Sequence, residues 1–421
     1  MFDLLIKGGH VIDPANHIDD IRDVAVIRGR IAAVDSAIAQ GAAVQTYDAS
    51  GMLVMPGLID IHTHVYRGVT FWGTDPNVIA PNTGVTTWVD AGSAGAFTID
   101  GLREFIVRPS CVRILAYLNI SALGLVAHNY ELTNLDLCDE ELFEMAINRN
   151  RDLVVGGKIR LGVTTIGQSG LVPLGRALNA LSRCELPLMV HIAEAPPHPR
   201  EFADQLRAGD VVTHCFTNLG MKLVNDQGQL HDFAKRWLDR GVLLDVGHGT
   251  SSFTYAVAEP LIAAGVKPDF ISTDLHQNNT AGPTFDLPTT MSKFVSLGMS
   301  LFDVVERVTI RPARFLGLQR EIGSLGSGSI ADIAVFRMEE SEIPLYDGNW
   351  QPRPARQLLH NVATFYSGRL LPRLGNSVTA SAHDWARGGR DRELYARQDL
   401  LRQSGHVPGY QGRPIRGIPL S

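Results

Sequence analysis

Two histidines separated by one residue, His62 and His64, end an apolar run that begins at Pro56. Side chains alternate between the two faces of a strand, so both imidazoles are expected on the same face. Two neutral imidazoles at the end of a buried strand can together bind one divalent metal ion. If they do so here, the chain is a metal-dependent hydrolase.

Four later apolar runs also carry, at or near their ends, a group that could bind a metal or move a proton: Lys158, His191, His214 and Asp274. Taken singly, each has a simpler interpretation, namely a hydrogen-bonded histidine, a surface lysine or an aspartate that caps a helix. Their convergence favours the functional interpretation, because polar groups at the ends of buried strands are costly unless they are paired or bind a metal.

Eight apolar runs that recur along the chain would position these groups. Runs that are apolar on both faces suit a parallel sheet covered by helices. Eight such units over about 260 residues predict an α/β fold, a (β/α)8 TIM barrel, whose active site lies at the C-terminal ends of the strands. A doubly wound open sheet is the alternative, but no glycine-rich phosphate loop follows the first strand. The runs are 58–64, 86–90, 113–120, 153–161, 186–192, 210–216, 242–246 and 270–274, with helices predicted at 140–150, 174–183 and 230–240.

Strand-and-turn patterns flank the predicted barrel. Residues 1–55 contain short strands with glycine turns, and the same pattern returns at 322–336. We expect 1–55 and 319–380 to form one small β-sandwich domain, with the barrel at 56–318. Residues 381–421 are rich in Arg and Gly and are predicted to be a solvated tail or an arm that packs on a neighbouring subunit of a homo-oligomer.

The composition excludes several classes of function. The 421 residues carry a formal net charge of −6, and acidic residues alternate with the arginines of the tail, so nucleic acid is not expected as a partner. No apolar stretch approaches the roughly 20 residues of a membrane span, and the N-terminus does not resemble a signal peptide. The four cysteines are widely spaced, which predicts no disulfide framework and favours a cytoplasmic location.

In its order of ligand-type residues, the chain resembles the amidohydrolase superfamily. The opening Pro56-Gly57-Leu58-Ile59-Asp60-Ile61-His62-Thr63-His64 and the closing Gly323-Ser324-Leu325-Gly326, with Ala331-Asp332-Ile333-Ala334-Val335, are similar to that family's two flanking signatures. Within the superfamily it most resembles the binuclear-metal branch that includes dihydroorotase, hydantoinase and a dihydroorotase-like deacetylase group.

That resemblance implies a set of roles. His62, His64 and Asp274 would bind one divalent ion, and His191 and His214 a second. Lys158, carboxylated by carbon dioxide to a carbamate, would bridge both. Zn²⁺ suits imidazole and carboxylate ligands, although Mn²⁺ and Fe²⁺ stay open. A metal-bridging hydroxide would attack the substrate carbonyl, and Asp274 would transfer its proton to the leaving group.

The substrate is expected to be a small molecule that bears a carboxylate, because arginines lie near the predicted rim. Arg67, Asn119, Arg160 and His276 are the candidate substrate-binding residues. Each also has a structural interpretation, as a surface arginine, a turn cap or part of the barrel wall. Dihydroorotases carry an arginine two residues after the second histidine, and here it comes three residues after, at Arg67, which argues against a housekeeping dihydroorotase.

Three functions remain open at this point. The phrase from His62 to Gly68 and the segment Gly156–Arg160 most resemble the deacetylase group, which removes acetyl groups from small N- or O-acylated acids. A cyclic-amide hydrolase of the dihydroorotase or hydantoinase type would use the same centre. A non-catalytic scaffold with this fold would be expected to have lost ligands, whereas all six candidates are present here.

Overall fold

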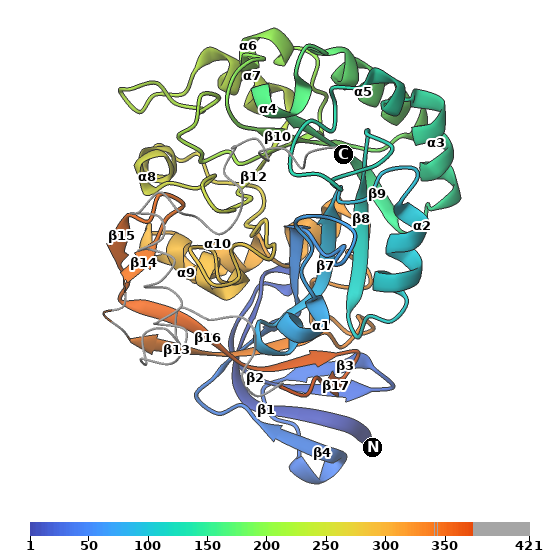
Figure 1. The fold of residues 1–421 in the computed structure, drawn as a ribbon. Coiled ribbons are helices and arrows are strands. Elements are labelled where there is room, and N and C mark those ends of the chain that lie inside the picture. The colour runs from blue at the N-terminus through green and yellow to red at the C-terminus, as the bar shows by residue number, and fades with distance from the viewer. Residues whose placement is uncertain (341, 343, 374–421) are drawn as a thin grey trace, which may run out of the picture.

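A computed structural model describes residues 1–340, 342 and 344–373. The predicted tail at 381–421 lies outside these described residues. Seven parallel strands form one curved sheet in the order β12-β11-β10-β9-β8-β7-β6, with helices outside it (Figure 1). The strands are β6 (Leu58–Thr63), β7 (Val85–Ala91), β8 (Arg113–Asn119), β9 (Val154–Leu161), β10 (Leu188–Ile192), β11 (Val211–Thr213) and β12 (Leu243–Asp245).

The eighth predicted strand closes the barrel without forming a regular ladder. Residues 270–275 pair with β12 through a single bridge between Asp245 and Phe270, and with β6 through one between Thr63 and Leu275. Side-chain oxygens accept bonds from nearby backbone N–H groups: Ser272 Oγ from Gly247, and Thr273 Oγ1 from Leu275. Such local bonds compete with ladder bonds, which explains the irregular strand.

Helices cover the barrel where the chain shows amphipathic spacing. Helix α5, for example, buries Leu174, Ala177, Leu178 and Leu181, which recur at helical spacing. The helices are α1 (Pro76–Ile79), α2 (Ile99–Leu102), α3 (Glu140–Arg149), α4 (Val163–Ile166), α5 (Val172–Cys184), α6 (Pro199–Phe202), α7 (Asp232–Arg240), α8 (Tyr255–Ala263), α9 (Leu287–Ser296), α10 (Leu301–Glu306) and α11 (Ile310–Phe315). Among the residues described, no helix is both long and apolar enough to span a bilayer.

The two flanks of the barrel meet in one further sheet. N-terminal strands, blue in Figure 1, and C-terminal strands, orange to red, lie together below the barrel. The sheet has the order β17-β16-β13-β5-β1-β2-β3, with β4 paired to β1, and a core that includes Val24, Val54, Val335 and Phe365 joins its two halves. Its strands are β1 (Phe2–Asp13), β2 (Ile18–Ile27), β3 (Arg30–Asp35), β4 (Ala43–Asp48), β5 (Leu53–Pro56), β13 (Ile333–Glu340), β16 (Gln357–Tyr366) and β17 (Arg369–Leu370).

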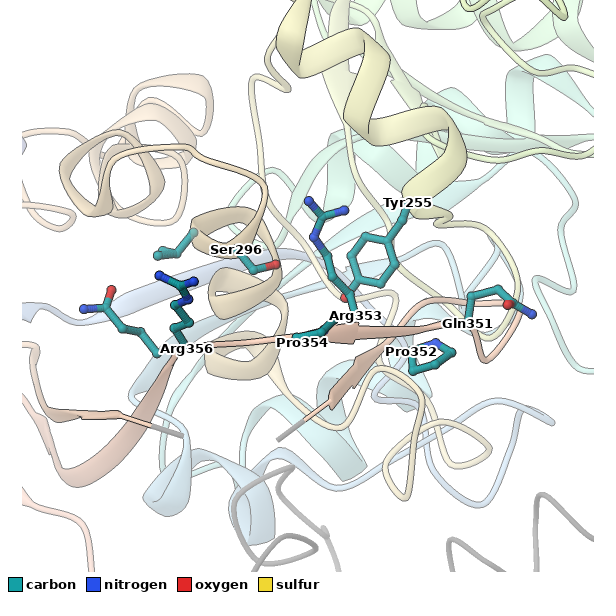
Figure 2. A pocket seen from close by; sticks show the side chains of 9 residues that line it. Tyr255, Ser296, Gln351, Pro352, Arg353, Pro354 and Arg356 are labelled. Carbon is teal, nitrogen blue, oxygen red and sulfur yellow. The ribbon is translucent and has the colours of Figure 1, made fainter. Parts of the chain in front are cut away.

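A short hairpin of β14 (Pro344–Tyr346) and β15 (Pro352–Pro354) packs beside α8 and α9. Between them lies an open groove of ≈ 610 Å³, whose lining includes Tyr255, Ser296, Arg353 and Arg356 (Figure 2). Arg353 pairs with Glu259 and lies over the Tyr255 ring. These contacts hold the hairpin against α8.

Candidate metal centre

The two histidines of the His-x-His motif lie at the end of β6 and face one carboxylate. His62 Nε2 is 3.4 Å and His64 Nε2 is 3.1 Å from Asp274 Oδ1. The three side chains come from opposite ends of the barrel sequence, yet one ligand atom of each lies within 4.8 Å of the others. Both imidazoles are buried, and Asp274 keeps 13% of its side chain exposed. This arrangement can bind a divalent cation.

The proton of His62 is held on the ring nitrogen that points away from this cluster. Its Nδ1 lies 3.2 Å from Asp245 Oδ2 and 2.8 Å from Thr213 Oγ1. Thr213 gives its own hydroxyl proton to Asp245, so His62 Nδ1–H is the donor to that pair. The lone pair of Nε2 therefore faces Asp274, as metal ligation requires. Burial holds the pKa of His62 well below its usual value, and lowers the pKa of His64 to about 3, so both rings are neutral.

The side chain of Lys158, on β9, extends to the same cluster. Its Nζ is 3.2 Å from His62 Nε2 and 3.5 Å from the sulfur of Met189. The side chain is almost fully buried, and this burial lowers the lysine pKa to about 8. A buried amine with a lowered pKa has an appreciable neutral fraction, which is the nucleophilic form.

A second pair of imidazoles lies beside the first. His191 Nδ1, on β10, is 2.7 Å from Nε2 of His214, which follows β11. His214 Nδ1–H donates to the carbonyl oxygen of Gly247 at 2.7 Å, which leaves Nε2 as the unprotonated nitrogen. The His62 and His214 rings are 5.2 Å apart. Burial lowers the pKa of His191 well below its ordinary value and that of His214 to about 4.

The chain turns sharply where two of these groups leave their strands. His214 has φ +69° and Asp274 has φ +49°, both in the left-handed region that few non-glycine residues occupy. Such conformations concentrate at functional sites, where they aim a side chain that a regular strand would direct elsewhere. Four neutral imidazoles and a carboxylate thus converge, a donor set that fits borderline divalent ions such as Zn²⁺.

Two buried aspartates that the sequence did not single out orient the candidate ligands. Asp245 Oδ1 accepts from Ser272 Oγ at 2.6 Å, while its Oδ2 holds His62 as described. Asp60 accepts bonds from the hydroxyl of Thr273 at 2.5 Å and from the backbone N–H of His62 at 3.3 Å. The sequence does contain a signal for both, since each is an acidic residue inside an apolar run.

The four predicted substrate-binding residues have different environments. His276 is buried, with its ring 6.5 Å from that of His64, and lies beside the cluster. Asn119 is buried, but its amide donates to Gly92 and accepts from Ser121, so it braces the backbone. The Arg67 side chain is 66% exposed and pairs with Asp75, away from the cluster.

Arg160 follows Lys158 by two residues on β9 and is paired within the protein. Its Nε and Nη2 bind both carboxylate oxygens of Glu131 at 2.6 and 2.8 Å, and Nη2 also donates to the carbonyl oxygen of His128. Nη1 makes no hydrogen bond to any residue that the structure describes. The ion pair neutralises a buried charge and leaves the two N–H donors of Nη1 without a partner among the described residues.

An aromatic cluster that the sequence reading missed lies next to His64. The Trp72 ring is 4.7 Å from His276, 4.7 Å from His128 and 6.4 Å from His64. Its indole Nε1 is buried and has no acceptor among the described residues. Trp72 thus provides an apolar surface and one N–H donor close to His64, a candidate ligand.

Comparison with known proteins adds four findings. Residues 164–359 match the model of the Amidohydrolase family. A deacetylase of Agrobacterium fabrum is 39% identical over 323 residues, which cover 76% of this chain and 79% of that protein. A solved adenine deaminase is 35% identical with a TM-score of 0.81, and the match covers 88% of this chain and 99% of the deaminase. A solved dihydroorotase is 33% identical with the same TM-score, over 88% of this chain and 98% of its own.

Proposed function

Because the chain belongs to the amidohydrolase family, a family of metal-dependent hydrolases, we propose that it removes an acetyl group from a small N- or O-acetylated carboxylic acid. The observation that carries this proposal is the convergence of His62, His64 and Asp274 at one end of the barrel. The 39% identity to a deacetylase supports the deacetylation in particular.

The donor set supports a centre for two divalent ions, with Zn²⁺ the best match. In this proposal His62, His64 and Asp274 hold one ion, and His191 and His214 hold the other. Lys158 as an ammonium would repel cations, whereas its carbamate would offer two anionic oxygens, so we include carboxylated Lys158 as the bridge. When bound, such ions lower the pKa of water and polarise a substrate carbonyl.

Asp274 is the proposed proton carrier. Its Oδ1 lies near both imidazoles. Its Oδ2 faces Gly249, and a Cβ added to Gly249 would lie only 2.8 Å from this oxygen. Oδ2 makes no hydrogen bond within the described chain and is the oxygen that can accept a proton from the attacking water. The same oxygen then returns the proton to the departing amine or alcohol, as general base and then general acid.

The Nη1 group of Arg160, which no described residue bonds, supports recognition of a substrate carboxylate. Nη1 can donate to an anionic oxygen, while Glu131 keeps the guanidinium fixed in its plane. His276 and Trp72 lie on the same side of the centre as His64 and would contact the rest of the substrate. Arg67 pairs with Asp75 at the surface and is less suited to this role.

A cyclic-amide hydrolase is the second candidate, since a solved dihydroorotase shares 33% identity over most of the chain. Both reactions would use the same centre and differ in the shape of the pocket. A homo-oligomeric state and a cytoplasmic location stay predictions, the latter supported by four cysteines that form no disulfide.

A screen with the Zn²⁺-loaded protein tests the proposal. Acetylated amino acids and hydroxy acids are compared with hydantoins and dihydroorotate, and kcat/KM is measured by acetate release or by ring opening. We expect acetate release from at least one carboxylate-bearing substrate and slower turnover of the same acid as its methyl ester. Ring opening without acetate release would replace the proposal with the second candidate, and inactivity towards both classes would favour the scaffold.

A further inference from the structure

A second buried lysine, Lys293 on α9, lies outside the metal centre, and it donates hydrogen bonds to two uncharged groups within the described part of the chain. Its side chain is fully buried, and Nζ donates to the carbonyl oxygen of Pro283 and to Nε2 of His248, both at 2.7 Å. Both acceptors are uncharged. Burying an amine in this way costs stability that an apolar side chain of similar shape would not cost. Packing alone therefore does not account for Lys293.

The lysine fixes the orientation of His248. Because Nε2 accepts from Lys293, the ring proton sits on Nδ1, which donates to the carbonyl oxygen of Gly249 at 2.9 Å. Thr284 Oγ1 donates to the same oxygen at 2.8 Å. The imidazole also stacks on Phe253, with ring centroids 4.8 Å apart. His248 is thus fixed on both edges and on one face.

His248 is the central residue of a turn, Gly247 to Gly249, that touches both halves of the metal centre. On one side the carbonyl oxygen of Gly247 accepts the Nδ1 proton of His214. On the other side Gly249 lies so close to Asp274 that a Cβ would be 2.8 Å from Oδ2. The two glycines have φ +46° and +55°. His248 is therefore the one residue of this turn whose side chain can hold it in place.

A second branch of the same network reaches the backbone of Asp274. Asn279 Nδ2 donates to the Asp274 carbonyl oxygen at 2.9 Å and lies 3.2 Å from Thr284 Oγ1. Thr284 in turn bonds the Gly249 oxygen that His248 holds. The turn and the left-handed conformation of Asp274 are therefore braced by one set of hydrogen bonds.

We propose that the buried Lys293–His248 pair is a positioning device for the reaction, which fixes the turn 247–249 and through it the imidazole of His214 and the carboxylate of Asp274. The inference rests on the proposed function, in which His214 binds an ion and Asp274 carries a proton. Neither Lys293 nor His248 touches the substrate, so both act through other residues.

The test measures the Zn²⁺ affinity of the full-length protein and of K293M, H248F and the double variant. Each protein is first freed of metal and then titrated calorimetrically with Zn²⁺ alone. Mutation of a group that orients a metal ligand typically lowers metal affinity or activity by about 10–100-fold. We expect each single variant to weaken the binding of the ion at His191 and His214 by about tenfold or more. It should lower kcat by a similar factor and leave KM within about twofold of the unaltered chain.

The double variant separates positioning from general destabilisation. If Lys293 acts through His248, the losses of Zn²⁺ affinity in the two single variants do not add. K293M/H248F then binds Zn²⁺ no more weakly than the more impaired single variant. The matched control is S292A on the same helix, which loses the bond from the backbone N–H of Leu359. It is expected to lower the melting temperature while leaving Zn²⁺ affinity and kcat unchanged.

Three outcomes would overturn the inference: K293M that binds Zn²⁺ and turns over like the unaltered chain, losses that add in the double variant, or a K293M phenotype limited to the melting temperature. If K293M does not fold, H248F alone carries the test, since it removes the imidazole of the pair while leaving the bond from Lys293 to Pro283. Unaltered Zn²⁺ affinity in H248F would equally overturn the inference. Because Zn²⁺ binding needs no substrate, a failure of the proposed deacetylation is recognised separately, by inactivity of the unaltered chain.

Discussion

Gly92, at the end of β7, lies against the stem of Lys158 on β9. A Cβ on residue 92 would be 2.5 Å from Lys158 Cβ and 2.7 Å from its Cγ, and Gly92 has φ +78°. Glycine at this position therefore decides whether the lysine can extend to His62.

G92A should lower kcat by about 100-fold, because a displacement of about 1 Å in an active site can cost that much. The matched control is G265A, where φ is +83° but no atom lies within 4 Å of the added Cβ. Both variants bear a backbone penalty of about 1–2 kcal/mol. Equal activity losses in the two, measured as kcat at equal folded fraction, would contradict the packing argument.

Replacing the proposed proton carrier should stop hydrolysis without unfolding the chain. D274N keeps the shape of the side chain but removes its basicity, so kcat should fall by about 100-fold or more. H62A should also abolish activity, through loss of an ion rather than of a proton carrier. Circular dichroism reports the fold and elemental analysis the metal content. Turnover near the original rate in either variant would rule out these roles.

Carboxylation of Lys158 can be detected directly. The chain incubated with ¹³C-bicarbonate and Zn²⁺ should give a carbamate carbonyl signal by NMR, and K158M should lack it. K158M should also bind both ions more weakly, since it removes the proposed bridge. Persistence of the signal in K158M would assign it to another amine, and its absence from the unaltered chain would remove the carbamate from the proposal.

Arginine variants separate the two candidates for carboxylate recognition. Removing Arg160 alone would strand buried Glu131, which costs about 3–5 kcal/mol, so the informative variant is R160M/E131Q. We expect a higher KM for a carboxylate-bearing substrate and little change for its methyl ester. R67M, which breaks only an exposed pair with Asp75, should stay within about twofold. A larger effect on KM from R67M than from the double variant would reverse the assignment.

The stability of the chain should depend on pH through Lys293. Burial lowers its pKa to about 7, with His248 as its neutral neighbour and the charges of Asp286 and Asp347 opposing the shift. Between about pH 7 and its ordinary value the unfolded chain binds the extra proton, so stability rises with pH there. K293M lacks this contribution.

The free energy of unfolding of the unaltered chain minus that of K293M should therefore increase from about pH 7 upward, by at most about 1.4 kcal/mol per pH unit. Urea unfolding from about pH 6 to about pH 9 measures it. The variant S292A keeps the lysine and is the control, so the free energy of unfolding of the unaltered chain minus that of S292A should not change with pH. A difference independent of pH would mean that Lys293 stays protonated in the folded chain.

Apolar runs and ligand types were readable in the sequence because each reflects local chemistry. A buried parallel strand must be apolar on both faces, so the runs that became β6 to β12 were recognisable, and a polar group closing such a run marks a strand end. The helix predicted at 140–150 is observed as α3, Glu140–Arg149, with Asp139 capping it. The eighth run is an exception, because hydroxyls of Ser272 and Thr273 replace the ladder bonds that its composition predicted.

Which polar groups face one another was decided only by the tertiary structure. Arg160 and Glu131 are 29 residues apart, and no local pattern signals that they form a bidentate pair. Likewise Lys293 appears in the sequence as an ordinary helical lysine, yet it lies against His248, 45 residues earlier. The sequence by itself determined the list of groups able to bind metal, since residue type and strand position fix that. Their distances, tautomers and pairings depend on how strands far apart in the chain are brought together around the barrel, and only the folded structure specifies those contacts.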